Sequence, residues 1–265
     1  MPIITVSRGS YSYGKQVAEK VAEKLGYECV SRDILIEASE EFNVPEIKLD
    51  RAIRHAPSCF EKFTFKKERY IAYIRAALLA HLAGDNVVYH GLAGHYFVTG
   101  VAHVLKVRIL AEEEDRVRLV MEREGISRDK ALHYLQVVDE ARRQWGLQLY
   151  GIDTNNPRLY DLVLHIKKFS ADDAAEVICL AAGMHCFQPT PESQKAIDDL
   201  LLAARIKAAL IDHHPRANVK ADGGAVYIGL EGASSRDREK IQQIVARFPE
   251  VKNLDLNVEP FMVPD

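Results

Sequence analysis

Eight residues near the start of the chain read Gly9-Ser10-Tyr11-Ser12-Tyr13-Gly14-Lys15-Gln16. Their spacing follows G-x-x-x-x-G-K-[ST], in which glycines let backbone N–H groups surround phosphate oxygens and the lysine reaches the outer phosphates. A short apolar run at residues 3–6 precedes them, and residues 15–25 follow with apolar positions at helical spacing. Because this motif requires a strand before it and a helix after it, we predict a phosphate-binding loop (P-loop) at these residues.

The last residue of the P-loop departs from the motif. Gln16 stands where a Ser or Thr hydroxyl would contact Mg²⁺. A glutamine can hold the ion only through its carbonyl oxygen or a bridging water, so the pattern leaves phosphoryl transfer and simple nucleotide binding both open. A surface turn that contains two glycines and a lysine by chance is the remaining alternative, and the flanking elements disfavour it.

The elements predicted after the P-loop alternate between strands and helices. Short apolar runs predict strands at residues 27–30, 86–90, 104–110 and 160–166. Helical spacing predicts helices between and after them, at residues 34–41, 43–56, 66–82, 112–124, 127–145 and 171–182. Strands that alternate with helices form a parallel sheet covered on both faces, so we predict an α/β fold with a three-layer αβα P-loop domain over residues 1–183.

Residues 184–195 break this alternation. They contain two prolines among residues that cap helices, which is typical of a linker followed by a new helix. Beyond them the pattern predicts a helix, two strands around a glycine turn, a second helix and a last strand, at residues 196–213, 218–220, 225–230, 236–248 and 252–258. We therefore predict a linker at residues 184–195 and a small α+β (αββαβ) domain at residues 196–265.

The composition excludes several classes of protein. Of the 265 residues, 48% are apolar and 28% charged, which is typical of a globular chain with a core. A formal net charge of −3 argues against a nucleic-acid-binding protein, which usually carries a basic face. The four cysteines show neither a C-x-x-C pair nor zinc-ligand spacing, so we expect reduced thiols, no metal-thiolate site and a cytoplasmic protein. Because no stretch approaches about 18 apolar residues, we expect no transmembrane segment, and no secretory signal is evident.

Several segments besides the P-loop carry a family resemblance. They are residues 3–33 and 111–123, together with Val87-Val88-Tyr89-His90-Gly91-Leu92-Ala93-Gly94, Gly125-Ile126-Ser127 and Tyr160-Asp161-Leu162-Val163-Leu164. Together they resemble the cytidylate-kinase-like branch of the nucleoside monophosphate kinases, and the resemblance covers nearly all of residues 1–183. It implies a five-stranded parallel sheet, a moving lid that bears arginines, ATP at the P-loop and a nucleoside monophosphate opposite it. In such a kinase Mg²⁺ bridges the ATP phosphates, so ATP and Mg²⁺ are the expected cofactors.

The resemblance also places a lid between residues 116 and 143. Phosphoryl transfer needs positioning and positive charge around the transferring group, so arginines on a closing segment are the expected catalytic groups. Asp139-Glu140-Ala141-Arg142-Arg143 is similar to the D-x-x-R pattern with which cytidylate kinases hold substrate. We expect the catalytic residues to be Lys15, Arg116, Arg123, Asp139 and Arg142. The alternative for each arginine is a solvated helix face, on which ion pairs contribute little.

The acceptor side departs from the family at two places. Arg32 and Asp33 follow the second predicted strand, at the place where the family binds the acceptor nucleotide, so we expect them to bind substrate. The alternative is that this segment is only structural and that Ser31 caps the next helix. Relatives usually carry G-R-G-A after the next strand, but here Leu92 replaces the arginine. The strand before Gly91 also ends without an acidic residue, so the Walker B carboxylate is missing. His90 and His95 could contact substrate, although a histidine near a strand end is more often structural.

Residues 196–265 resemble a BON domain, through Ala204-Arg205-Ile206-Lys207, the turn at residues 222–228, the helix at 237–248 and the strand at 251–258. This resemblance implies a binding role, and phospholipid attachment has been proposed for the family. From residue 196 onward the chain has nine lysines and arginines against eleven aspartates and glutamates. Since the domain lacks the excess positive charge that draws proteins to anionic lipid, a protein contact or sensing role is favoured over a lipid contact.

Two functional hypotheses follow. The first is an ATP-dependent kinase that transfers the γ-phosphoryl group to a nucleoside monophosphate of the CMP or dCMP type. The second is a nucleotide-binding regulator that lacks efficient transfer and signals through its C-terminal domain, as Gln16 and the two departures on the acceptor side suggest. A coupled assay beside a nucleotide-binding measurement separates the two.

Overall fold

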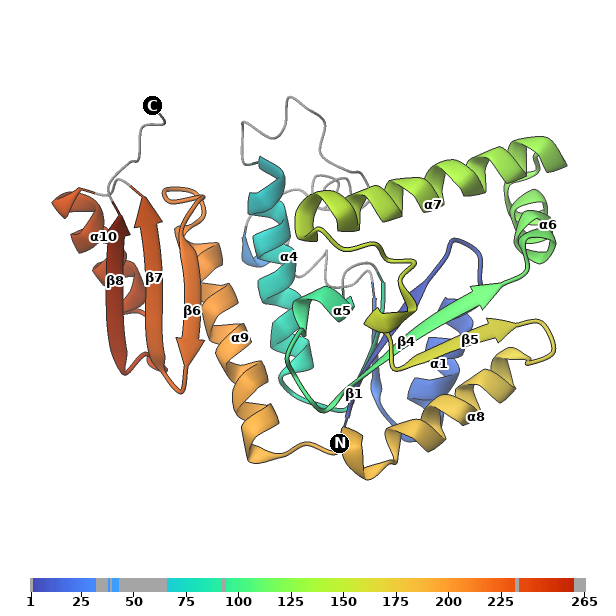
Figure 1. Cartoon of the computed structure of the whole chain (residues 1–265), viewed down its shortest axis with the longest axis horizontal. Helices are drawn as coiled ribbons and strands as arrows, with labels where there is room; N and C mark the ends of the chain where they lie inside the picture. The colour runs from blue at the N-terminus through green and yellow to red at the C-terminus, as the bar shows by residue number, and fades with distance from the viewer. Residues whose placement is uncertain are drawn as a thin grey trace.

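The structure is a computed structural model, and it describes residues 2–31, 38, 40–42, 66–91, 94–231 and 234–259. Its elements form two groups along the chain. The first surrounds a five-stranded sheet, and the second surrounds a three-stranded sheet near the C-terminus (Figure 1). Among the described residues, no helix is both long and apolar enough to span a membrane.

The larger sheet is parallel throughout. Its order is β2-β3-β1-β4-β5, formed by β2 (Glu28–Val30), β3 (Val87–His90), β1 (Ile3–Arg8), β4 (Val104–Ala111) and β5 (Leu162–Ile166). The chain order reverses at β1, because β3 lies on one side of it and β4 on the other. In open α/β sheets, ligands bind at the carboxyl ends of the strands beside such a reversal. The P-loop follows β1 and therefore occupies this position.

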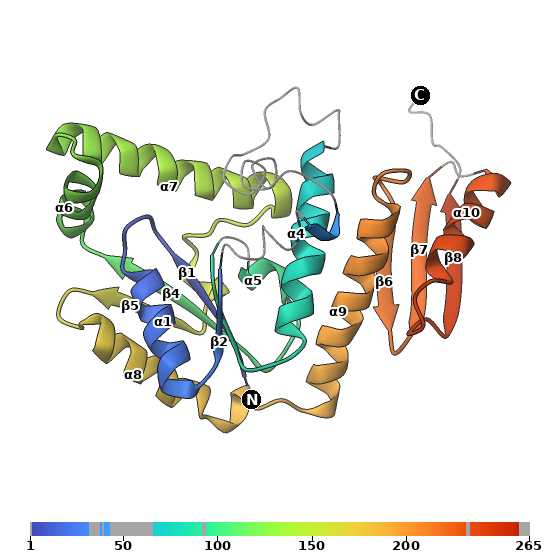
Figure 2. The same ribbon diagram turned by 180° about the vertical axis from the view of Figure 1, so that it is seen from behind.

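Helices cover both faces of this sheet. On one face α1 (Gly14–Leu25) packs beside α8 (Ala171–Ala182), as Figure 2 shows, and their apolar residues form one core with alternate residues of β1 and β4. On the other face lie α4 (Lys66–Leu82) and α5 (Gly94–Phe97), whose core includes Leu78, Leu79 and Phe97. The predicted three-layer αβα domain is thereby confirmed.

Two helices form an arm that leaves the sheet at the end of β4. They are α6 (Glu113–Glu124) and α7 (Arg128–Tyr150), and α7 runs back above the carboxyl edge of the sheet (Figure 1). The arm has a small apolar core of its own, formed by Val117, Val120, Ala131 and Leu135. After α7 the chain returns through η2 (Pro157–Leu159) to β5.

The C-terminal part contains the second sheet. After η3 (His185–Phe187) come α9 (Pro191–Leu210), β6 (Asn218–Asp222), β7 (Ala225–Glu231), α10 (Ser235–Val245) and β8 (Asn253–Glu259). β6 pairs with β7 in antiparallel fashion, and β8 pairs with the other edge of β7 in parallel. This arrangement confirms the predicted small αββαβ unit.

Helix α9 begins five residues before its predicted start at residue 196. Pro191 occupies the first turn, where its missing N–H costs nothing, and the side chains and backbones of Thr190 and Ser193 cap each other. The prolines that indicated a linker therefore mark a helix start. The domain boundary at residues 184–195 stays a prediction.

Two opposite sides of α9 carry buried apolar residues. Ile197, Ala204 and Ala208 join the core that contains α4, while Leu202, Ile206 and Leu210 join the core beneath the small sheet. The helix thus lies between the two groups of elements, as Figures 1 and 2 show. One helix supplies part of two hydrophobic cores.

Candidate active site

The P-loop connects β1 to α1 through an uncommon backbone. Tyr11 and Tyr13 adopt left-handed conformations, with φ of +55° and +64°. Residues other than glycine seldom occupy this region, and such conformations gather at functional sites. At Gly14, a Cβ atom would lie 2.4 Å from the Arg8 side chain, so only glycine fits there. The second glycine of the motif therefore has a steric reason in this structure.

Hydrogen bonds inside the loop hold its shape. The Ser12 hydroxyl donates to the carbonyl oxygen of Gly9 at 2.9 Å. The Ser10 hydroxyl is buried, and its oxygen has no hydrogen-bond partner among the described residues. A buried hydroxyl without a partner is costly, so this group favours a polar ligand at the loop. The residues of the loop therefore fit a bound phosphate.

Lys15 and Gln16 lie exposed at the start of α1. The Lys15 ammonium lies 3.5 Å from Glu19 one turn along the helix, and both side chains are more than half exposed. A surface pair of this kind contributes little, so it leaves Lys15 able to reach a phosphate. The side chain of Tyr13, the N-cap residue of α1, makes no capping hydrogen bond, which leaves the positive end of the helix for an anion.

The arm brings three predicted residues onto the loop. The Arg116 Nε donates to the carbonyl oxygen of Ser10 at 2.7 Å, and the guanidinium also pairs with Asp139. The backbone N–H of Ser10 donates to Oδ1 of Asp139 at 3.1 Å. Arg142 donates to the carbonyl oxygen of Arg8 at 3.2 Å. Arg116, Asp139 and Arg142 therefore lie together at the start of the P-loop, while their role in a lid stays a prediction.

Arg123 meets the loop differently. Its guanidinium lies over the ring of Tyr11, 5.7 Å from the ring centre, and the Tyr11 hydroxyl donates to Glu124 at 2.8 Å. The Tyr11 ring also meets Tyr134 of α7 edge to face. Burial, followed by the hydrogen bond to Glu124, raises the pKa of Tyr11 to about 12, so the hydroxyl stays protonated. Tyr11 thus joins the loop to the arm, a role that the motif alone did not indicate.

A second polar cluster lies where the chain returns from α7 to the sheet. Ser7 of β1 shares a hydrogen bond of 3.2 Å with the hydroxyl of Tyr160. Arg108 of β4 donates to that hydroxyl at 3.1 Å and to the carbonyl oxygen of Thr154 at 2.6 Å. Ser7 and Arg108 lie opposite each other on neighbouring strands, and each is a polar residue in an otherwise apolar strand. Their polarity was the sequence signal for this cluster, but the sequence did not reveal that both contact the hydroxyl of Tyr160.

The histidines of the acceptor side are buried. His90 ends β3, and His95 lies in α5 against the rings of Tyr96 and Tyr160. Burial, helped by the charges of Arg108 and Lys106, lowers the pKa of His95 to about 3, so its imidazole is neutral. The buried Nε2 of His95 has no hydrogen-bond partner among the described residues, so its role stays a prediction.

The predicted acceptor residues Arg32 and Asp33 lie outside the described residues, as does Leu92. Within the described ranges, no three His, Cys, Asp or Glu side chains gather as metal ligands. For Mg²⁺, the loop offers only the side chain of Gln16 at the expected position.

A family model described as "Cytidylate kinase-like family" matches residues 3–168. The chain belongs to this family. A cytidylate kinase from Pyrobaculum aerophilum is 30% identical over 178 residues, which cover 67% of this chain and 90% of that protein. A cytidylate kinase from Archaeoglobus fulgidus is 28% identical over 191 residues, with coverage of 67% and 93%. The predicted kinase-like family is thus confirmed for the P-loop part, and the match ends before α9.

The fold is also found among solved structures. An uncharacterized protein from Eubacterium ventriosum superposes with a TM-score of 0.52 at 20% identity, covering 69% of this chain and 98% of that protein. At this identity the likeness shows the fold alone. It assigns neither a family nor a substrate.

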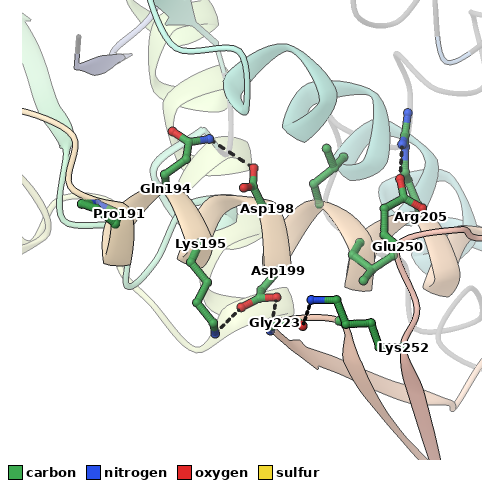
Figure 3. Close-up of a pocket in the computed structure, with 12 residues that line it drawn as sticks. Pro191, Gln194, Lys195, Asp198, Asp199, Arg205, Gly223, Glu250 and Lys252 are labelled. Atoms are coloured by element: carbon green, nitrogen blue, oxygen red, sulfur yellow. Dashed lines mark hydrogen bonds and ion pairs between the residues drawn. The ribbon is translucent and has the colours of Figure 1, made fainter.

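A cavity of about 570 Å³ lies away from the P-loop, between α9, the β6–β7 turn and the start of β8 (Figure 3). Its charged side chains link α9 to the small sheet. Lys195 pairs with Asp222 of β6, Asp199 accepts from the backbone N–H of Gly223 at 2.7 Å, and Arg205 lies 3.7 Å from Glu250. These contacts hold α9 against the small sheet, so the cavity wall serves packing.

Proposed function

We propose that this member of the cytidylate kinase-like family transfers the γ-phosphoryl group of ATP to a nucleoside monophosphate of the CMP or dCMP class. The observation that carries the proposal is the set of contacts from Arg116, Asp139 and Arg142 to the backbone of residues 8–10. An arm with two arginines against a P-loop supplies the positioning and positive charge that phosphoryl transfer needs. The names of the relatives support the choice of acceptor.

Each group has a distinct role in the proposed reaction. The backbone N–H groups of the loop and the start of α1 bind the ATP phosphates, and Lys15 reaches the β- and γ-phosphates. An oxygen of the acceptor phosphate attacks the γ-phosphorus, the bond to the β–γ bridging oxygen breaks, and ADP leaves. Arg116 and Arg142 offset the negative charge on the transferring group. Mg²⁺, held through the Gln16 carbonyl or a bridging water, would supply further charge neutralisation on the phosphates.

The acceptor site is proposed on the sequence alone. We propose that Arg32 binds the acceptor phosphate bidentately and that Asp33 binds the nucleoside. Arg123, near the end of α6, is included in the proposed site because its guanidinium lies over the ring of Tyr11 in the P-loop.

The test is ADP formation with ATP and each of CMP, dCMP, UMP and AMP. Lys15→Ala should lower kcat/KM by about a thousandfold, because Lys15 stabilises charge on the β- and γ-phosphates during transfer. Lys20→Ala is the matched control, since Lys20 lies on the same helix and pairs with Asp172 at 2.6 Å. An unchanged rate in Lys15→Ala, or an equal loss in Lys20→Ala, would contradict the mechanism.

A second function is favoured by two features, the exposed Gln16 and the absence of an acidic residue at the end of β3. In this alternative the protein binds nucleotide without efficient transfer and signals through its C-terminal, BON-like part. Its net negative charge favours a protein partner over an anionic lipid surface. Nucleotide binding without release of ADP would support the regulator over the kinase.

A further inference from the structure

The side chain of Asp139 occupies hydrogen-bond donors of the P-loop. One carboxylate oxygen accepts from the Ser10 N–H, and the other pairs with the guanidinium of Arg116. Arg116 in turn donates to the carbonyl oxygen of the same Ser10. The three residues form a closed set of contacts, which we name the carboxylate clasp. It joins the loop to both helices of the arm.

The clasp satisfies groups that a phosphate would also use. A backbone N–H in a phosphate-binding loop and an arginine above it are donors that bind phosphate oxygens well. A carboxylate is an anionic acceptor of the same kind. Two anions cannot share these donors at close range without repulsion, and the site is partly shielded, since the Arg116 side chain is only 15% exposed.

The clasp can open without disrupting the buried core of the arm. The four buried residues of that core, Val117, Val120, Ala131 and Leu135, come from α6 and α7. The contacts of Arg116, Asp139 and Arg142 with residues 8–10 are polar, whereas the ring of Tyr11 packs against the core of the arm. Opening the clasp therefore exchanges polar contacts and need not separate Tyr11 from the arm.

We propose that Asp139 is an internal competitor of nucleotide phosphates. In the absence of nucleotide the carboxylate clasp holds the arm on the loop, and a phosphate that takes the Ser10 N–H and Arg116 displaces Asp139. This inference rests on the proposed function, because it assumes that the P-loop binds a nucleotide. Only molecules with an open clasp can bind phosphate, so the apparent affinity equals the intrinsic affinity multiplied by the open fraction. Binding of a nucleotide therefore shifts the arm towards the open arrangement.

The test compares binding of inorganic tripolyphosphate and of ATP by calorimetry. Tripolyphosphate has neither base nor ribose, so it reports on the phosphate donors alone. Asp139→Asn keeps the size of the side chain but removes the charge that holds Arg116, and it should tighten tripolyphosphate binding by about five- to tenfold. Asp139→Ala, which also removes the acceptor for Ser10, should do the same.

Glu140→Gln is the matched control. Glu140 is the next residue on α7 and carries the same charge, but it pairs with Arg143 and not with the loop. Glu140→Gln should change the dissociation constant of tripolyphosphate by less than about twofold, since it removes a charge that acts on the loop only from a distance. Equal effects of Asp139→Asn and Glu140→Gln, with wild-type binding intact, would overturn the clasp and leave the proposed function standing. Failure of the wild-type protein to bind either probe would overturn both.

Discussion

Helices α7 and α9 are of similar length but are held in different ways. α7 meets the P-loop through Asp139 and Arg142, and part of its surface is open, with Val137 54% exposed. α9 is buried on two faces, and Ile197 and Ile206 are fully inaccessible. Polar contacts to a ligand-binding loop can be exchanged for contacts to the ligand, whereas apolar contacts in two cores cannot. α7 is therefore suited to move with ligand binding, and α9 to hold its neighbours together.

The largest expected effect concerns the arm. Arg116→Ala should lower kcat/KM for phosphoryl transfer by about a thousandfold, which is roughly 4 kcal/mol of transition-state stabilisation. It should lower the free energy of unfolding by only about 1–2 kcal/mol, because the contacts that it removes, to Asp139 and to the carbonyl oxygen of Ser10, are polar and partly shielded. Steady-state kinetics and urea unfolding measure the two quantities.

Arg118→Ala is the control for this variant. Arg118 lies on the same helix and pairs with Asp115, and its side chain is 66% exposed. Its kcat/KM should match that of the wild-type protein. If Arg118→Ala lowers kcat/KM as much as Arg116→Ala, phosphoryl transfer depends on the total positive charge of α6 and not on the specific contact of Arg116 with Ser10.

The next effect concerns the stability that α9 provides. Ile206→Ala should lower the free energy of unfolding by about 2–4 kcal/mol, because it leaves a cavity in the core beneath the small sheet. Val137→Ala on α7 should change it by less than about 0.5 kcal/mol, since that side chain is exposed. Because α9 contributes to both cores, we expect urea to unfold the Ile206→Ala variant in one shifted transition. A separate transition at the wild-type midpoint would show that the cores unfold independently.

The smallest expected effect is a pH dependence on α9. Burial lowers the pKa of Lys207 from 10.5 to about 8, although its ammonium donates to the carbonyl oxygen of Pro215 at 2.7 Å. Between about pH 8 and 10.5 the unfolded chain holds a proton that the folded chain has released, so this group makes stability rise with pH. The slope of the unfolding free energy against pH is smaller than the uptake of one full proton on unfolding would give, because the Lys207 side chain keeps partial contact with water.

Lys207→Met isolates this contribution. The difference in unfolding free energy between wild-type protein and variant should increase in favour of the wild type from pH 7.5 to 10. Urea unfolding at several pH values measures it, and the other titrating groups cancel in the difference. A difference that is flat or falls with pH would contradict the assignment to Lys207.

Local patterns predicted the fold well because each element carries its own signal. The spacing of Gly9, Gly14 and Lys15 placed the loop, and the alternation of apolar runs and amphipathic segments placed the parallel sheet. The start of α9 was predicted too late, because prolines also occur in linkers. Only the reciprocal cap of Thr190 and Ser193 distinguishes a helix start there.

The sequence suggested residues for the candidate site but not their contacts, and the roles of those residues stay predictions. Arg116, Asp139 and Arg142 were expected at a lid, yet no pattern indicates that Asp139 accepts from Ser10, since these residues are 129 positions apart. Likewise, Ser7 and Tyr160 meet across 153 positions. Contacts of this kind depend on how the arm returns to the sheet, which is a property of the whole fold and not of any segment.

The shared helix α9 affects where the chain can be shortened. α9 packs along α4, and both contribute to the core on that face of the large sheet. A truncated chain that stops at residue 183 would leave the apolar residues of α4 in water, and exposed apolar patches of this kind cause aggregation. We therefore expect that the P-loop part expressed without α9 is poorly soluble. A truncation which retains residues 184–211 should not recover soluble protein either, because it exposes Leu202, Ile206 and Leu210, which pack beneath the small sheet.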